Sequence, residues 1–273
     1  MALSELQKAI LRVLAKHRSE SSYLAGGLIL NKDWPRRSDD IDIFHDADEQ
    51  VAEAANLDIE ALNAAGFKVN RDFIIYGCVD ATVSDRSDST VIQWFAETKL
   101  RFFPLVRDEE WGARLHQADL AVNKVLAVSG RSKARDIADL VAIGRQYCAI
   151  GPLVLAAAGK PPNFSPLRIV DEMRRHTRSI PADEFAAVKG LPDEWTAAFI
   201  REEALIMLDA AERYVLGTAP DLVGLLASGP DGTPIEVGET NRADVVLRKA
   251  TEEPEVVAAP AGFTAIDWSP GRP

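Results

Sequence analysis

The segment Asp40–Phe44 has the sequence D-I-D-I-F, in which acidic and apolar residues alternate. Such alternation is typical of a β-strand with two different faces, because successive side chains point to opposite sides of a strand. We therefore predict a strand here, with the carboxylates of Asp40 and Asp42 on one face and the isoleucines on the other. Two carboxylates placed this close repel each other unless a cation lies between them. The alternation thus predicts both a local structure and a negative charge that needs compensation.

A pair of glycines, Gly26 and Gly27, lies upstream and follows the short apolar segment 23–25. Without side chains, glycines let backbone N–H groups approach phosphate groups closely. Three polar residues directly precede the carboxylates: Arg36, Arg37 and Ser38. Paired aspartates suit Mg²⁺ or Mn²⁺, which are held by few protein carboxylates together with substrate phosphates. The combination predicts a site for a nucleotide and a divalent cation, with Asp40 and Asp42 as the metal ligands.

A lysine on a largely apolar helix is the second candidate. Residues 119–129 are predicted to be helical, with Asp119 as the N-cap, and Lys124 lies among their apolar residues. A triphosphate would be a suitable anionic partner for this lysine, and the alternative is a lysine that extends to solvent at the helix edge. Asp136 lies in the first turn of a second helix, predicted over 132–147. It would orient Lys124, bind nucleotide, or merely stabilise its helix through the helix dipole.

The order of predicted elements indicates an α+β or mixed α/β fold. A helix is expected at 4–18, a helix at 47–65, and three strands follow the second helix at 67–76, 79–84 and 90–96. Further helices are expected at 166–178, 182–189 and 193–216, and a hairpin around 223–237. We divide the chain into a core at 1–118, a helical region at 119–218 that completes the cleft, and an acidic, loosely structured tail at 219–273.

The composition excludes several classes of protein. The formal net charge is −11, which disfavours broad binding of DNA or RNA, because phosphate contacts supply most non-specific affinity. The N-terminus does not resemble a signal peptide, and no apolar run approaches the length of a membrane span. The two cysteines, Cys78 and Cys148, are expected to be reduced thiols. We therefore expect a cytoplasmic protein that does not contact a membrane.

The segment YLAGGLIL…RRSDDIDIF resembles the first motif of the nucleotidyltransferase superfamily, and it is most similar to the AbiEii/AbiGii-type toxins. A later segment, DLAVNKVLAVSGRSKARDIADL, is similar to a second motif of that family. The resemblance spans roughly residues 20–147 and implies a polymerase-β-like core with a mixed sheet. The positions that match the two motifs are Gly26, Gly27, Arg36 or Arg37, Ser38, Asp40, Asp42, Lys124, Arg135, Asp136 and Asp139.

The resemblance implies an enzyme that transfers NMP from an NTP to a hydroxyl acceptor with Mg²⁺ or Mn²⁺, and Asp40, Asp42 and Lys124 would be catalytic. The nucleotide would be held by Gly26, Gly27, Arg37, Ser38, Lys124, Arg135 and Asp136. The acceptor would be an RNA 3′ end, a protein or a small molecule. A toxin-like role would further imply an antitoxin protein as partner.

One departure from the superfamily pattern concerns a third carboxylate, which many polymerase-β-like enzymes place on a later strand. The segment STVIQWFAE aligns best with that strand and offers Gln93 in place of an acid, with Glu97 or Asp88 as substitutes. This motivates a second hypothesis, a nucleotide-binding or interaction protein with impaired catalysis. A third hypothesis, a nucleotide-sugar glycosyltransferase, also uses D-x-D to hold a metal on a diphosphate, but the glycine pair and the Lys124 segment disfavour it.

Overall fold

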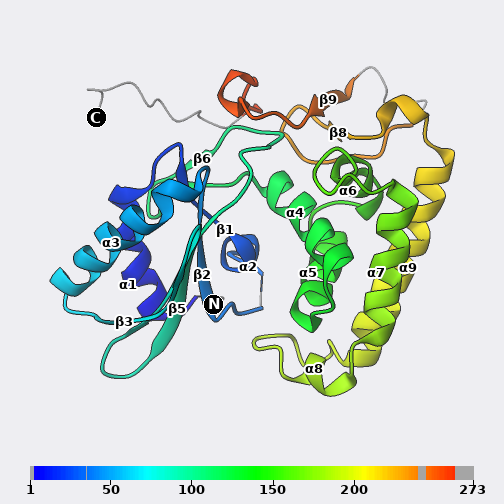
Figure 1. Ribbon diagram of the computed structural model, residues 1–273. Coiled ribbons are helices and arrows are strands. Elements are labelled where there is room, and N and C mark those ends of the chain that lie inside the picture. The colour runs from blue at the N-terminus through cyan, green and yellow to red at the C-terminus, as the bar shows by residue number, and fades with distance from the viewer. Residues whose placement is uncertain (1–2, 35, 239–243, 262–273) are drawn as a thin grey trace. The chain divides into compact units, whose positions relative to one another are not determined.

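The computed structural model describes residues 3–34, 36–238 and 244–261 (Figure 1). These residues form two compact units. Unit one runs through Lys99 and resumes at Pro104–His116, and unit two contains Leu100–Phe103 and the described residues from Gln117 onward. The change of unit at His116 lies two residues before the boundary proposed from the sequence. The mixed α/β fold class agrees with the prediction.

Unit one is built on a mixed seven-stranded sheet, in which the strand order is β3-β4-β5-β2-β1-β7-β6. The strands are β1 (Ser22–Ala25), β2 (Asp40–His45), β3 (Lys68–Ile75), β4 (Cys78–Ser84), β5 (Ser89–Ala96), β6 (Val106–Asp108) and β7 (Gly112–Arg114). The β2–β5 and β1–β7 pairs are parallel, and the other neighbours are antiparallel. The predicted strands at 40–44, 67–76, 79–84 and 90–96 are confirmed within two residues.

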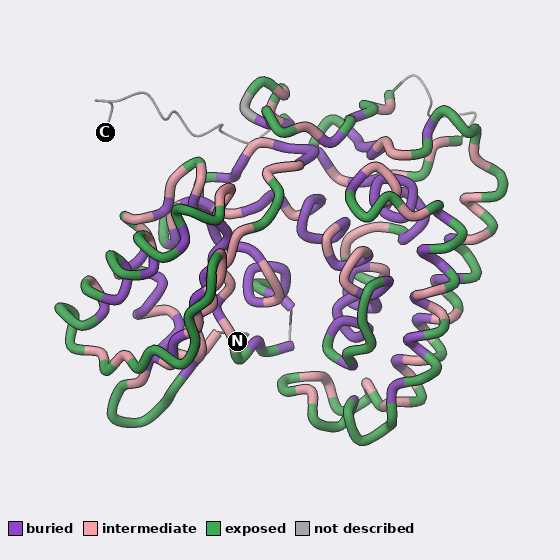
Figure 2. The backbone as a smooth tube through the Cα atoms, viewed as in Figure 1, coloured by how far each residue is buried: buried purple, intermediate pink, exposed green. Residues whose placement is uncertain are grey.

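Two helices, α1 (Glu5–Leu14) and α3 (Asp48–Ala64), lie against one face of this sheet (Figure 1). Helix α1 begins at a capping box, in which Ser4 and Gln7 bond each other's backbone N–H groups. The apolar face of β2, with Ile41 and Ile43, is fully buried on this side (Figure 2). The opposite face therefore carries the alternating Asp40 and Asp42, which are half-buried.

A buried carboxylate links the elements on the apolar side of unit one. Asp58 of α3 is fully buried and accepts hydrogen bonds from Arg18 at 2.5 Å, His17 at 2.7 Å and the Trp94 indole at 2.8 Å. Three donors replace the water that burial removes, and the Arg18 guanidinium balances the charge. Burial, with a contribution from Arg18, lowers the pKa of the nearby His45 to about 4.

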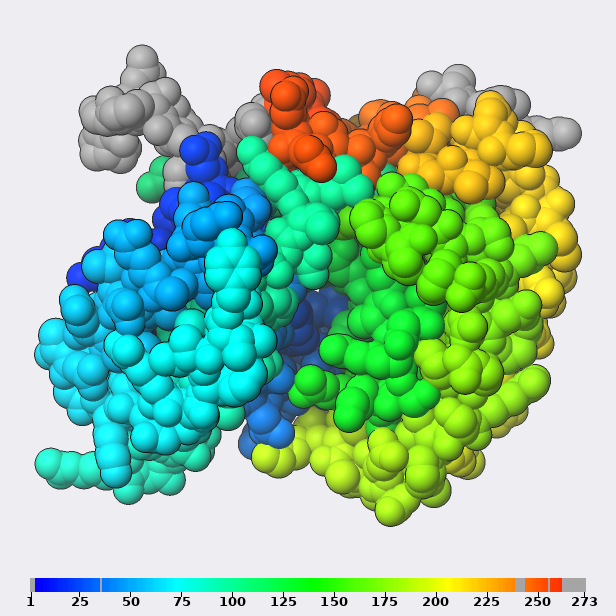
Figure 3. Space-filling view, in the orientation of Figure 1, coloured from blue at the N-terminus to red at the C-terminus, as the bar shows by residue number. Residues whose placement is uncertain are grey.

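One edge strand of the sheet is β3, and the end of this strand is unusually apolar for a surface. Phe73, Ile74, Ile75 and Tyr76 are all exposed. In the space-filling view the β3–β4 hairpin, coloured cyan, lies on the surface of unit one (Figure 3). A bulge between Arg71 and Phe73 interrupts the pairing of β3 with β4, and bulges of this kind are one way in which edge strands are kept from pairing further.

Unit two is mainly helical. Its helices are α4 (Gln117–Gly130), α5 (Ala134–Gln146), α6 (Ile150–Ala157), α7 (Pro166–Ser179), α8 (Ala182–Ala186) and α9 (Ala197–Gly217). The N-cap role predicted for Asp119 is wrong: its fully buried carboxylate accepts the backbone N–H groups of Phe102 and Phe103 at 2.9 and 3.1 Å. Asp119 thereby fixes the segment Leu100–Phe103 within this unit.

The described part of the segment predicted to be a loose acidic tail contains regular structure. Strand β8 (Leu225–Ser228) pairs with β9 (Val246–Lys249), and α6 contacts β8. The hairpin predicted around 223–237 is present only as a short turn. An antiparallel bridge joins Ser228 to Pro234, and backbone hydrogen bonds run from Gly229 N to the Thr233 carbonyl and from Ile235 N to the Ala227 carbonyl. Residues 239–243 and 262–273 of the predicted tail lie outside the described residues.

Candidate functional site

The glycine pair and the carboxylate pair meet in space through the pairing of β1 with β2. Ala25, the last residue of β1, lies opposite Asp42 in the antiparallel register. Gly26 follows with φ +71°, and a Cβ atom at this position would overlap the carboxylate of Asp42. Both the left-handed backbone and the contact require glycine here. A five-residue helix, α2 (Gly26–Leu30), then starts at the glycine pair.

The second glycine lies against the residues that precede the carboxylates. A Cβ atom at Gly27 would overlap the guanidinium of Arg36 and come within 3.3 Å of the Ser38 hydroxyl. Arg36 is buried and donates to the carbonyl of Arg37 at 2.8 Å, whereas the side chain of Arg37 is exposed. Of the two arginines that matched the motif, Arg36 is therefore the one in contact with the glycine pair.

Three further hydrogen bonds fix the approach to β2. The Ser38 hydroxyl donates to Asp40 Oδ1 at 2.5 Å, and the amide of Gln7 on α1 donates to the Ser38 carbonyl at 2.8 Å. Thr90 Oγ1 also donates to the Asp39 carbonyl at 2.8 Å. The position of the Asp40 carboxylate thus depends on α1 and β5 as well as on its own strand.

The donors on this face fit a hard divalent cation. Asp40 and Asp42 project from the same half-buried face of β2, and the missing side chain of Gly26 lets the Asp42 carboxylate lie against the backbone there. Within the described residues no group of three or more His, Cys, Asp and Glu side chains could hold a metal. Mg²⁺ commonly uses one or two carboxylates and completes its shell with water and phosphate oxygens, so two aspartates suffice.

The register of the sheet places Gln93 directly beside Asp42, because the two are partners in the parallel β2–β5 pair. On its other side Gln93 is the partner of Asp80 on β4, and its Nε2 donates to Asp80 Oδ2 at 3.0 Å. The proposed substitutes lie elsewhere. Glu97 follows the end of β5 and is exposed, and Asp88 is exposed in the β4–β5 turn, where it accepts the N–H of Ser89.

Asp80 was missed by the sequence reasoning. The signal for it was present, because it alternates with Val79, Ala81 and Val83 in the same manner as the aspartates of β2 alternate with isoleucines. Its position next to Gln93 depends on the register of the hairpin formed by β4 and β5. The turn sequence DRSDS does not fix that register by itself.

In unit two, Lys124 is held by two carboxylates. Its Nζ atom lies 2.7 Å from Asp136 Oδ1 and 2.9 Å from Asp139 Oδ2, and all three side chains are buried. Although burial disfavours the ammonium ion, Asp139 and Asp136 outweigh it and raise the pKa of Lys124. Asp136 also accepts from Arg131 at 2.8 Å. Burial alone would raise the pKa of Asp136, but the attraction of Lys124 and the hydrogen bond from Arg131 lower it to about 2.

The lysine is therefore oriented as predicted for an Asp136 partner, and the alternative of a lysine extending to solvent at the helix edge does not apply. The side chain of Arg135 lies on the exposed side of α5. Because Asp136 and Asp139 together balance the charges of Lys124 and Arg131, the cluster is neutral as a whole.

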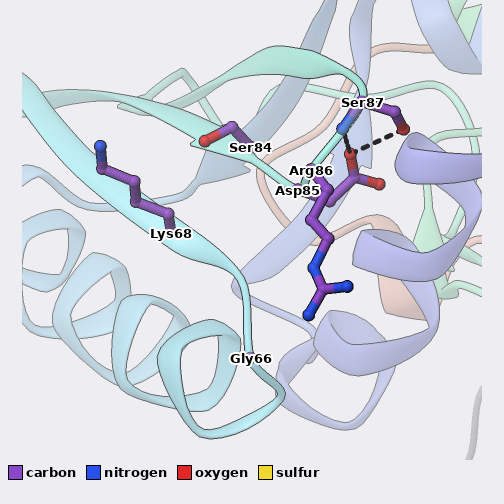
Figure 4. Close-up of a pocket in the computed structure, with 6 residues that line it drawn as sticks. All are labelled: Gly66, Lys68, Ser84, Asp85, Arg86 and Ser87. Carbon is purple, nitrogen blue, oxygen red and sulfur yellow. Dashed lines mark hydrogen bonds between the residues drawn. The ribbon is translucent and has the colours of Figure 1, made fainter.

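A separate pocket of about 490 Å³ lies at the far end of the β3–β4 hairpin (Figure 4). Its lining residues are Gly66, Lys68, Ser84, Asp85, Arg86 and Ser87. Asp85 Oδ1 accepts hydrogen bonds from the backbone N–H and the hydroxyl of Ser87, at 2.7 and 3.0 Å. The pocket contains none of the site residues predicted from the sequence.

Comparison with solved structures finds a nucleotidyltransferase with a similar fold. MenT4, a nucleotidyltransferase toxin from Mycobacterium tuberculosis H37Rv, is similar to this chain with a TM-score of 0.56 and 15% identity, over 80% of this chain and 84% of that one. At this identity the likeness establishes the fold.

Two other solved structures match more distantly and add nothing to the assignment of the fold. A candidate nucleotidyltransferase from H. pylori has a TM-score of 0.46 and 16% identity, over 80% of this chain and 100% of that one. A tRNA-processing enzyme in an apo form has a TM-score of 0.31 and 13% identity, over 80% and 59%. No protein-family model and no curated protein matches the sequence. Among the described helices, none combines the length and apolar character needed to cross a membrane.

Proposed function

We propose that this protein is a metal-dependent nucleotidyltransferase that moves NMP from an NTP to a hydroxyl acceptor. The observation that carries the proposal is the contact of Gly26 and Gly27 with Asp42, Arg36 and Ser38. Residues separated along the chain converge on one half-buried sheet face that offers oxygen ligands, a hydroxyl and a guanidinium. The fold shared with MenT4 supports the same class of chemistry.

In the proposed reaction the acceptor oxygen forms a bond to the α-phosphorus, the bond from that phosphorus to the β-phosphate bridging oxygen breaks, and pyrophosphate leaves with release of the hydroxyl proton. Asp40 and Asp42 would hold Mg²⁺ or Mn²⁺, which when bound supplies positive charge against the triphosphate oxygens. Ser38 keeps the Asp40 carboxylate oriented, and the absent side chain of Gly26 lets the Asp42 carboxylate take its place against the backbone. Preorganisation of this kind lowers the barrier because the groups need not rearrange during reaction.

The test is transfer of label from α-labelled NTPs to RNA, protein and small hydroxyl acceptors in the presence of Mg²⁺. Transfer should disappear in Asp40→Ala and Asp42→Ala. Asp39→Asn is the matched control, because Asp39 is an exposed acid that lies next to Asp40 in the chain and precedes strand β2. Undiminished nucleotide binding and turnover in the double variant Asp40→Ala, Asp42→Ala would exclude the proposal.

For Lys124, Arg135 and Asp136 we propose a role in nucleotide binding, which the motif resemblance suggests. It is supported by the fixed, protonated state of Lys124, although the same geometry suits a purely structural ion pair. Arg135 separates the two roles, because its exposed side chain can be removed with little effect on packing. Arg135→Ala should weaken NTP binding in calorimetric titration, whereas Arg178→Ala, on the exposed surface of α7, should not. If Arg135→Ala binds NTP as tightly as the wild type, the cluster around Lys124 has a structural role only.

We further propose a toxin-like role in the cytoplasm with a protein antitoxin as partner, in which the acceptor is an RNA 3′ end, a protein or a small molecule. The name of MenT4 as a toxin supports this proposal. Expression of the wild-type chain in a host without the antitoxin should arrest growth, and expression of Asp40→Ala should not. Arrest by both, or by neither, would count against the toxin role while leaving transferase activity to be judged by the labelling test.

A second candidate, a nucleotide-binding protein with impaired catalysis, is favoured by one observation. Gln93 lies beside Asp42, at the position where a third carboxylate was expected. Binding of NTP without release of pyrophosphate would support it, and a gain of turnover in Gln93→Asp would support it further.

A further inference from the structure

Three polar residues form one row across the centre of the sheet in unit one. Asp42 on β2 is the register partner of Gln93 on β5, and Gln93 is in turn the partner of Asp80 on β4. Side chains of directly opposed residues point to the same face of a sheet, so all three lie on the face that carries Asp40. All three are half-buried, in contrast to the fully buried Ile43 and Trp94 on the other face.

The contact between Gln93 and Asp80 fixes the orientation of the glutamine amide. A carboxylate accepts hydrogen bonds and donates none, so the group that faces Asp80 must be the amide nitrogen. The distance from Nε2 to Asp80 Oδ2 is 3.0 Å. The carbonyl oxygen of the same planar amide therefore turns away from Asp80. Because β2 lies on the opposite side of β5 from β4, this oxygen is presented on the side of Asp42.

Asp80 is itself held in place. The Cys78 thiol, two residues earlier on the same face of β4, donates to Asp80 Oδ1 at 3.7 Å, so that each carboxylate oxygen has a donor. Adjacent strands are separated by about 4.8 Å, which puts the backbone of Asp80 roughly 10 Å from that of Asp42. This is too far for the two carboxylates to share one cation through short side chains. Asp80 can influence a cation at Asp42 through Gln93.

We propose that Gln93 supplies a neutral carbonyl oxygen to the cation held by Asp40 and Asp42, and that Asp80 is the positioning residue that keeps this oxygen, rather than the amide nitrogen, turned toward it. The inference rests on the proposed function. It explains how a chain with glutamine at this place retains an oxygen donor beside its carboxylates. The negative charge that a third carboxylate would have supplied at Gln93 on β5 is instead carried by Asp80 on the neighbouring strand β4.

The test is a titration of the full-length protein with Mn²⁺ in the absence of nucleotide, in which electron paramagnetic resonance reports free Mn²⁺. Removal of groups that orient a metal ligand typically costs 10–100-fold in metal affinity. We expect Gln93→Leu and Asp80→Asn each to weaken Mn²⁺ binding about tenfold. Asp88→Asn is the matched control, since it removes the same charge from the exposed β4–β5 turn, and should leave affinity unchanged. Thermal melting identifies any variant that fails to fold.

A double-mutant cycle separates positioning from simple loss of charge. If Asp80 acts through Gln93, Asp80→Asn should have no further effect in the Gln93→Leu background. If Asp80 acts by its charge alone, the two effects will add, and the inference is wrong. The exchange Asp80→Asn with Gln93→Glu should bind Mn²⁺ more tightly than wild type, because an anionic oxygen then replaces the neutral one.

The outcomes also separate this inference from the proposed function. Mn²⁺ binding that needs Asp40 but is unchanged in Gln93→Leu would overturn the roles of Gln93 and Asp80 and leave the function standing. Absence of Mn²⁺ binding by the wild-type protein would overturn both.

Discussion

The buried cluster at Lys124 makes a strong quantitative prediction. Its ammonium lies 2.7 and 2.9 Å from Asp136 and Asp139, whose side chains are at most 1% exposed. Lys124→Met keeps the apolar stem and removes the charge, which leaves buried carboxylates near each other. Breaking a buried pair in this way costs roughly 3–5 kcal/mol. Because Arg131 still bonds Asp136, we expect about 3 kcal/mol, near the lower end of that range.

The same variant should show an inverted dependence on pH. In the wild type the pKa of Asp136 lies at about 2, below its ordinary 3.8, so its contribution is complete above pH 3.8 and is lost as pH falls toward 2. Without Lys124 the buried Asp136 carboxylate loses the strongest attraction that lowers its pKa, so burial should raise this pKa above the unfolded value. The variant should therefore gain stability relative to wild type as pH falls from about 7 to about 5.

Hydrogen exchange of peptides within 117–146 is the appropriate assay, because a chain with two compact units need not unfold in one step. The opening free energy of α4 and α5 should fall by about 3 kcal/mol at neutral pH and by less at pH 5. Lys249→Met removes an exposed charge in the same unit and should change it by under about 0.5 kcal/mol. A loss below about 1 kcal/mol, or one equal at both pH values, would refute the reasoning.

Three further predictions concern unit one. Gly26→Ala should lose Mn²⁺ binding as well as stability, because the new Cβ atom would overlap Asp42. Gly66→Ala is the control, since Gly66 also has a positive φ of +90° but no atom within 4 Å of a Cβ. It should lower the free energy of unfolding by about 1–2 kcal/mol without affecting Mn²⁺ binding. Retained Mn²⁺ affinity in Gly26→Ala would contradict this. Because the pKa of His45 is lowered to about 4, the free energy of unfolding should be at its full value above pH 6.5 and fall by about 3 kcal/mol as pH drops toward 4. Urea unfolding at several pH values measures this loss, and His45→Leu should make the free energy of unfolding less dependent on pH. Asp58→Asn should lower the free energy of unfolding by roughly 3–5 kcal/mol in the same assay. A loss below about 1 kcal/mol would show that the three donors to Asp58 find other partners.

Much of the central sheet could be predicted from the sequence, because its strands carry strong period-two patterns. The helices α1, α3, α4 and α5 were also predicted, although the capping residue assigned to α4, Asp119, was wrong. Helix α6 was missed, since IGPLVLAA is apolar on all sides and has no period to detect. Strands β6 to β9 are three or four residues long and are defined by their partners rather than by their own sequences.

The candidate site was predictable where it depends on local sequence and not where it depends on register. Gly26, Asp40 and Asp42 could be selected because their spacing has a chemical reason. The choice of Arg36 over Arg37 as the contact of Gly27 needed the path of the chain before β2. The position of Asp80 beside Gln93 depends on the register of β4 and β5. A pattern with period two is equally compatible with registers that differ by two residues, so the sequence does not fix this register.

The contact between the glycine pair and β2 has a consequence for the chain segment that connects Gly27 to Ser38. The ends of that segment are fixed by the β1–β2 pairing and by the bond from Gln7 to Ser38, and not by the conformation of the segment itself. Lengthening a chain between fixed ends costs only about 0.6 kcal/mol for each doubling of its length. A peptide epitope inserted at the exposed Lys32–Asp33 step can therefore be carried at low entropic cost while the carboxylates of β2 keep their places.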